Sequence, residues 1–273
     1  MKTFNRVFTV IVFLFLYIPM IVLAVASFNA GTDIAVWKGF TFAQYGALFR
    51  DGVLLPLLAN SVIVAVIASL VATVLGTMAA IGIRAMSGRM RRITMAVTNI
   101  PLTNPEIVTG VSLALLFAFA GQMMKLNNVL GFTTLLIAHI TFCLPYVIFN
   151  VSPKLRQLDP AVYDAALDLG CNPRQAFFKV VLPQLTPAIL SAFLISLTYS
   201  IDDFIISYFT SGTMQTLPIA IYSMTKKKVS PEINALSAIM FVVILTIILA
   251  ANAVDSAKER RLRRAARAEE GIS

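Results

Sequence analysis

Long apolar runs separated by short polar segments dominate this chain. Six of them are long enough to cross the hydrocarbon core of a bilayer, which takes about 20 helical residues. In chain order they are Val7–Phe28, Leu57–Ile83, Ile93–Ala120, Phe132–Val151, Leu185–Tyr208 and Ala235–Val254. The first run follows Lys2 and Arg6, as in a signal peptide, but it exceeds the roughly 7–15 apolar residues of such a peptide. We therefore expect an all-α membrane protein with six transmembrane helices.

One long polar segment between two of these runs, Asp159–Pro183, carries the signals of two short helices. Asp159 can accept hydrogen bonds from the free N–H groups of a first helix, and Pro160 suits its first position. Gly170 fits the left-handed turn that closes this helix. The small side chains of its Ala-Ala pair allow another surface to approach closely.

A second helix is predicted directly after this glycine. Asn172 and Pro173 begin it in the same way, with Gln175 as the capping-box partner three residues on. Pro183 is expected to limit how far this helix continues. The segment is therefore predicted to be two short helices that meet at a sharp corner on a membrane surface.

The composition supports a membrane protein. Of the 273 residues, 58% are hydrophobic and 13% are charged, with a mean hydropathy of +0.84. Soluble domains are about 45–50% apolar and about 25% charged. The net charge of +9 would suit nucleic acid, but the charges flank the apolar runs, so no nucleic acid partner is expected. No metal site is evident, and His139, the single histidine, is expected to be a packed residue without a partner.

The basic residues predict an orientation. If the N-terminus is inside, the inner segments hold 16 of the 22 lysines and arginines, and none lies within a run. Basic residues accumulate on the cytoplasmic side of membrane proteins. We expect both termini, the segment 159–183 and the basic tail 255–273 to be cytoplasmic.

Three acidic residues fall within the apolar runs: Glu106, Asp202 and Asp203. A charged residue at mid-membrane costs about 2.5–3.5 kcal/mol on insertion scales, so such residues normally face a cavity or a partner. Glu106 follows Pro101 and Pro105, which break the helical hydrogen-bond ladder.

On a continuous helix Ser200 and Asp203 share a face, whereas Asp202 points elsewhere. Trp37 and Tyr199 offer aromatic faces for a cation. These residues suggest a path for a positively charged solute. Alternatively, the acids cap broken helices or contact a neighbouring subunit, and Trp37 belongs to an interfacial aromatic belt.

The spacing in the polar segment resembles the EAA loop of ABC importer permeases. That family pattern is Glu-Ala-Ala-x3-Gly-x9-Ile-x-Leu-Pro, and Asp164 and Val180 replace its Glu and Ile here. The resemblance implies a MetI-like permease fold and a cytoplasmic loop that couples to a separate ATPase. The residues that it assigns to coupling are Asp164, Ala165, Ala166, Gly170, Pro173, Leu182 and Pro183. An ordinary amphipathic helix-turn-helix is the alternative.

Further stretches resemble the second permease chain of spermidine/putrescine transporters. They include Tyr17–Met20, Ser27–Asn29, Ala138–Cys143, Asp202–Ser207, Leu217–Met224 and Val229–Leu236. The resemblance implies a polyamine substrate, a partner permease, a cytoplasmic ATPase dimer, a periplasmic solute-binding protein and a bacterial inner-membrane location. It also implies that Trp37, Glu106, Asp202 and Asp203, with Ser200 beside them, belong to the substrate path.

The chain itself has no phosphate-binding Gly-x4-Gly-Lys-Ser/Thr loop, so ATP and Mg²⁺ are expected to bind the partner ATPase, and no residue here is expected to be catalytic. We treat 1–273 as one membrane permease domain surrounded by lipid. A permease for another small charged solute, a proton-driven secondary transporter and a membrane scaffold are the alternatives.

Overall fold

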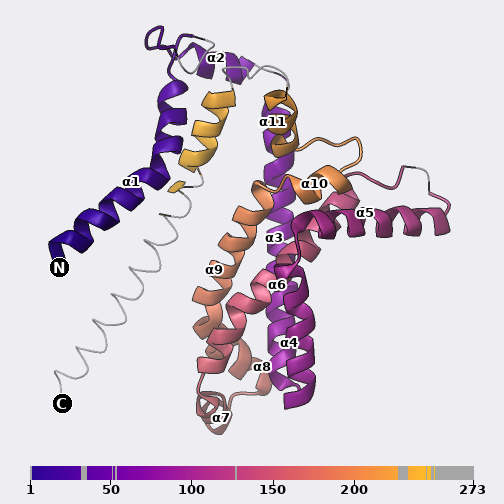
Figure 1. Cartoon of the computed structure of the whole chain (residues 1–273). Coiled ribbons are helices and arrows are strands. Elements are labelled where there is room, and N and C mark those ends of the chain that lie inside the picture. Colours follow the sequence, from indigo (N-terminus) through magenta and orange to yellow (C-terminus); the bar gives the residue numbers. More distant parts are fainter. Residues whose placement is uncertain are drawn as a thin grey trace. The chain divides into compact units, whose positions relative to one another are not determined.

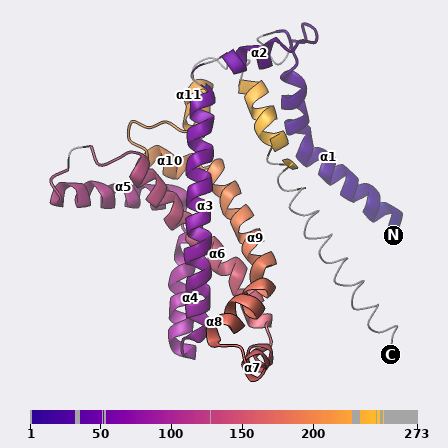
Figure 2. The same cartoon turned by 180° about the vertical axis from the view of Figure 1, so that it is seen from behind.

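In the computed structural model the regular elements of the described residues are helices (Figures 1 and 2). It describes residues 2–31, 36–50, 52, 54–126, 128–226, 233–243, 245, 246 and 249. Within this part of the chain, β-structure is limited to one isolated bridge between Asn29 and Phe40. The chain forms two compact units: unit 1 comprises 1–56 and 221–273, and unit 2 comprises 57–220.

Unit 1 contains α1 (Lys2–Ala26), α2 (Ala43–Arg50) and a shorter apolar helix, Ile233–Val243. α1 exposes apolar side chains along its length, as expected of a helix whose solvent is lipid. Asn29 organises the loop after α1. Its Oδ1 accepts hydrogen bonds from the backbone N–H groups of Gly31 (3.0 Å) and Lys38 (2.9 Å).

Unit 2 is built around α3 (Leu54–Ala85), which begins in unit 1, and α6 (Phe132–Gln157). A stripe of small residues recurs every fourth position of α3: Ala68, Ala72, Gly76 and Ala80. A Cβ added at Gly76 would lie 2.7 Å from the Cβ of Val147 on α6. Small residues at this spacing let membrane helices approach closely. Gly76 is therefore required for α3 to pack against α6.

The third predicted span, Ile93–Ala120, is divided into two helices just before Glu106, as the prolines there predicted, although Pro101 itself lies inside the first helix. The structure has α4 (Gly88–Thr103) and α5 (Glu106–Met123), and Figures 1 and 2 show α5 running across the direction of α4. Asn104 between them is extended, with φ −77° and ψ 145°. A residue that precedes proline is driven toward this conformation, so Pro105 explains where α4 ends.

The fifth predicted span, Leu185–Tyr208, is also divided. α9 (Leu182–Ile201) packs against α6 and ends before two aspartates, and α10 (Ile205–Thr210) follows and packs against α5 and α6. α11 (Leu217–Thr225) leads from unit 2 into unit 1. The two helix breaks, at 104–105 and 202–204, give unit 2 its irregular backbone.

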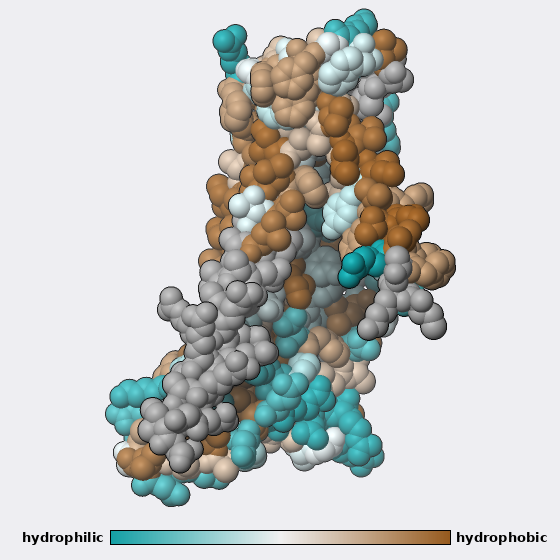
Figure 3. All heavy atoms as spheres, turned by 90° about the vertical axis from the view of Figure 1, so that its left-hand side faces the viewer, coloured by the Kyte–Doolittle hydropathy of each residue, from teal (hydrophilic) through white to brown (hydrophobic). Residues whose placement is uncertain are grey.

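Among the residues that the structure describes, five helices are long and apolar enough to cross a membrane. They are Phe4–Ala26, Leu54–Ala85, Glu106–Met123, Phe132–Gln157 and Pro173–Ile201. The sixth predicted span, Ala235–Val254, lies partly outside the described residues and the tail 255–273 wholly so, and the count of six stays a prediction. In Figure 3, hydrophilic residues cover most of the lower end, where Figure 1 places the polar segment after α6, and hydrophobic residues dominate above it.

Candidate functional site

The predicted two-helix corner is present in the structure. The first helix is α7 (Pro160–Asp168), and the Asp159 Oδ1 accepts a hydrogen bond from the N–H of Ala161 (2.9 Å). Gly170 has φ +86°, and the N–H of Cys171 donates to the carbonyl of Ala166 (3.0 Å). This is the helix-ending motif in which a left-handed glycine satisfies the last carbonyls.

The second helix, α8 (Pro173–Ala176), begins with the predicted capping box. The N–H of Gln175 donates to the Asn172 Oδ1 (2.8 Å), and the Gln175 Oε1 accepts from the N–H of Asn172 (3.1 Å). The expectation that this helix stops near Pro183 is wrong. A π-helical turn, η1 (Phe177–Val181), joins α8 directly to α9. The wider turn accommodates Pro183, which lacks an N–H and lies in the first turn of α9.

The segment Asp159–Pro183, to which the sequence resemblance assigns a coupling role and which we call the coupling loop, therefore continues without a helix break into α9. Asp164 and Ala165 are exposed, whereas Ala166 is buried. Leu169 stands at the corner with 86% of its surface exposed. Sequence reasoning missed Leu169, although an apolar residue directly before a left-handed glycine was a visible signal. Single exposed apolar residues are normal on protein surfaces, so Leu169 is a candidate contact because of its place at the predicted corner.

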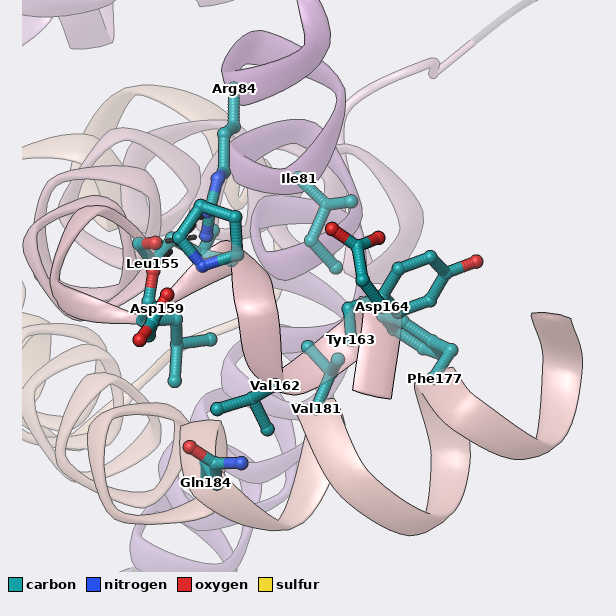
Figure 4. Close-up of a pocket in the computed structure, with 12 residues that line it drawn as sticks. Ile81, Arg84, Leu155, Asp159, Val162, Tyr163, Asp164, Phe177, Val181 and Gln184 are labelled. Carbon is teal, nitrogen blue, oxygen red and sulfur yellow. Dashed lines mark hydrogen bonds between the residues drawn. The ribbon is translucent and has the colours of Figure 1, made fainter. Parts of the chain in front are cut away.

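A pocket of about 270 Å³ lies behind the coupling loop (Figure 4). Arg84 enters it from α3 and donates hydrogen bonds to the carbonyls of Leu155 and Leu158, at the end of α6. Asp164 lies with Tyr163 and Phe177 on the other side of the pocket. A cation at the carboxyl end of a helix satisfies its free carbonyls and its negative dipole. Arg84 thereby fixes α3 and α6 to the start of the coupling loop.

A second group of functional candidates surrounds the break between α9 and α10. Asp203 is buried, and its carboxylate accepts hydrogen bonds from the N–H groups of Ile206 (3.3 Å) and Ser207 (2.7 Å). It thus caps α10. Its Oδ2 lies 3.5 Å from the Nε2 of His139. The structure therefore supports the capping alternative for Asp203.

His139 is buried, as expected, but the expectation that it lacks a partner is wrong. Its Nδ1 shares a hydrogen bond with the Ser200 hydroxyl (2.6 Å) and its Nε2 with the Ser207 hydroxyl (2.9 Å). Ser200, Asp203 and Ser207 thus form one buried polar network with His139 that connects α6, α9 and α10. A buried network of this kind satisfies polar groups that lipid cannot.

Asp202 and Glu106 differ from the buried Asp203, because both are exposed. Asp202 ends α9 with φ −100° and ψ 0°, and Glu106 lies in the first turn of α5 with no side-chain capping bond. The two carboxylates interact electrostatically with each other. Gly110, one turn after Glu106, lies against Phe209 of α10, so the two helix breaks are neighbours.

Two tyrosines accompany these carboxylates. The rings of Tyr146 and Tyr199 are 4.5 Å apart between centroids, and Phe142 packs edge-on against Tyr146 at 5.4 Å. Glu106 interacts electrostatically with Tyr146. We call Glu106, Asp202, Tyr146 and Tyr199 the aromatic-acid cluster. Sequence analysis named three of its members and missed Tyr146, whose place beside Tyr199 depends on the packing of α6 against α9.

Trp37, the remaining candidate, has 54% of its surface exposed and belongs to unit 1. All four residues of the aromatic-acid cluster belong to unit 2. Carboxylates beside aromatic faces form a surface that attracts organic cations.

Known proteins resemble this chain over most of its length. The PotI protein of Escherichia coli K12, a putrescine transport system permease protein, is 38% identical over 231 residues, 84% of this chain and 82% of the relative. The PotC protein of Haemophilus influenzae, a spermidine/putrescine transport system permease protein, is 37% identical over 246 residues, 90% of this chain and 93% of the relative.

Solved structures share the fold. A chain of a bacterial ABC transporter that imports alginate has a TM-score of 0.69 at 16% identity, covering 94% of this chain and 95% of that one. A chain of the MetNI methionine ABC transporter has a TM-score of 0.61 at 15% identity, covering 75% and 95%. The family model for binding-protein-dependent transport system inner membrane components matches residues 72–264. This chain therefore belongs to that family.

Proposed function

We propose that this chain is one of two permease subunits of an ATP-driven importer in the bacterial inner membrane, and that the importer carries a polyamine such as putrescine or spermidine. The aromatic-acid cluster carries the cargo assignment. Polyamines hold ammonium groups on a flexible methylene chain, and these groups are bound by exposed carboxylates and by tyrosine faces. The names of the relatives at 37–38% identity support the same cargo class.

In this proposal the coupling loop receives motion from the ATPase, which binds ATP and Mg²⁺. Both termini and the loop are cytoplasmic, and a periplasmic binding protein delivers the polyamine from the other side. The inner bias of lysines and arginines supports this orientation. The continuous path α8–η1–α9 supports the mechanical role, because a push on the loop reaches the helix that ends at Asp202.

The cargo assignment is tested by uptake of radiolabelled putrescine and spermidine in cells without other polyamine transport. We expect Glu106→Gln and Asp202→Asn each to lower uptake at limiting substrate by about tenfold or more, because a charge-assisted hydrogen bond contributes about 1.5–3 kcal/mol. Glu106→Asp keeps the charge and should retain most of the uptake.

Unchanged uptake in both neutral variants would remove these residues from the path. Vesicles separate the remaining alternatives. Uptake that needs ATP and resists a protonophore supports the importer, whereas loss of uptake with the protonophore supports a secondary transporter. Competition by another small charged solute, but not by polyamines, would contradict the polyamine assignment and leave the assignment as an ATP-driven importer unchanged.

Coupling is tested at Leu169. Leu169→Glu places a charge on a side chain that touches little of its own chain, so the free energy of unfolding should stay within about 0.5 kcal/mol. An apolar anchor at a protein interface contributes about 2 kcal/mol or more, so association with the ATPase should weaken by about thirtyfold. Retention of the ATPase by the variant at wild-type affinity would exclude this corner as the contact.

A further inference from the structure

A second pocket of unit 2 opens between the ends of α3, α4 and α6 that adjoin the coupling loop. Its volume is about 420 Å³, within the range of about 300–1,000 Å³ for small-molecule sites. Figures 1 and 2 both show these three helices side by side at this end. Four arginines line the pocket: Arg84, Arg91, Arg92 and Arg156. We call it the arginine pocket.

The charge of the arginine pocket is not balanced within the described chain. Arg84 donates to carbonyl oxygens of α6, which carry no full charge. Among the described residues, the one side-chain ion pair joins His139 and Asp203. No described carboxylate therefore forms an ion pair with Arg91, Arg92 or Arg156. Like charges around one cavity repel each other, and an anion between them relieves this repulsion. Guanidinium groups match phosphate oxygens in particular, because their N–H groups bind in pairs.

An independent feature of the same pocket indicates a ligand. Ser152 of α6 lines it with only 8% of its surface exposed, and its buried hydroxyl has no hydrogen-bond partner in the structure. Most buried polar side chains in folded proteins are hydrogen-bonded, so the orphan hydroxyl of a pocket-lining serine requires an explanation. A hydroxyl donates readily to a phosphate oxygen, and four arginines line the same pocket.

The apolar part of the pocket lining favours a lipid over free phosphate. Ile83, Met95 and Leu155 line the same space as the arginines. A headgroup beside the arginines would therefore place the start of its acyl chains against these apolar side chains. Basic pockets between membrane helices on the cytoplasmic side are typical sites for anionic lipid headgroups.

We propose that the arginine pocket binds the phosphate of an anionic phospholipid, with Arg91, Arg92, Arg156 and Ser152 as its donors. The leaflet follows from the orientation proposed above, whereas the binding site itself does not depend on the transported solute. Because Arg84 lines both this pocket and the one behind the coupling loop, the lipid lies beside the connection between α3 and that loop.

The test uses the full chain assembled with its partner subunits, in nanodiscs of equal parts phosphatidylglycerol and phosphatidylcholine. Native mass spectrometry measures which lipid is retained after transfer to detergent. Each basic residue near anionic lipid contributes about a fivefold change, so Arg91→Gln/Arg92→Gln should lower phosphatidylglycerol retention by about thirtyfold. Ser152→Ala, a small change inside α6, should lower it about fivefold. Arg89→Gln is the matched control, since Arg89 lies on the same helix but does not line the pocket.

Three outcomes would overturn the proposal. An equal loss in Arg89→Gln and in the double variant would indicate general surface attraction. Displacement of the lipid by millimolar inorganic phosphate would indicate a free-phosphate site. Retention of phosphatidylglycerol by the permease pair but not by the complex with its ATPase would assign the pocket to protein docking. None of these readouts requires transport, so failure of the cargo assignment leaves them interpretable.

Discussion

Two places in this molecule use an aspartate to start a helix, and they differ in where the aspartate finds its partners. Asp159 starts α7 in an exposed position, and its carboxylate binds the N–H of a residue two positions on. Asp203 starts α10 in a buried position, where it binds two N–H groups and lies 3.5 Å from His139 of another helix. The hydrogen bond of Asp159 is a local helix cap, whereas the contacts of Asp203 also hold together helices that are distant in sequence.

The difference matters because water can replace the partners of Asp159 but not those of Asp203. Unpaired polar groups are costly in a dry interior and nearly free at a wet surface. The cap of α7 can therefore exchange its partner for water, whereas the break after α9 keeps its partners. Next to this break, Asp202 is exposed, as the proposed contact with a solute requires.

The sharpest test of this comparison is Asp203→Ala. The change leaves two backbone N–H groups and an imidazole without their buried acceptor, so the free energy of unfolding should fall by about 3–5 kcal/mol. Thermal unfolding of the purified chain in detergent, or its yield in the membrane, measures this loss. The matched control is Asp202→Ala, an exposed neighbour that should cost less than about 1 kcal/mol. Equal costs for the two variants would contradict the structural role of Asp203.

The same contrast explains what the sequence could predict. The caps of Asp159 and Asn172 were predicted because their partners lie two or three residues away. The break at 202–204 was not predicted, since residues 198–208 hold neither glycine nor proline, and Asp203 acts through His139, 64 positions earlier in the chain. Pro105 signalled the end of α4, but the direction of α5 is set by its packing against α10. The π-helical turn Phe177–Val181 was also not predicted, because it arises where a continuous helix has to accommodate Pro183.

Substitution of Gly170, at the corner of the coupling loop, is expected to cause a loss of stability of intermediate size. Gly170 has φ +86°, and an added Cβ would meet no atom within 4 Å, so the cost of a side chain there is backbone strain alone. Gly170→Val should cost about 1–2 kcal/mol and lower transport per ATP hydrolysed, because the strain is relieved by opening the corner. Gly170→Asn is the control, since asparagine tolerates the left-handed region and should behave nearly as wild type. Equal transport in the Val and wild-type proteins would show that the corner geometry does not carry coupling.

The smallest effect is expected for Asp159→Ala. Loss of an exposed helix cap costs about 1 kcal/mol, and here the exposed N–H of Ala161 can bind water instead. Hydrogen exchange should quicken at the first turn of α7 and remain unchanged in α10. The reverse pattern, with global unfolding at a cost equal to that of Asp203→Ala, would mean that the coupling loop is as fixed as the membrane break. In that case water would not replace the lost cap of Asp159, and the contrast between a wet, exchangeable cap and a dry, fixed one would not hold.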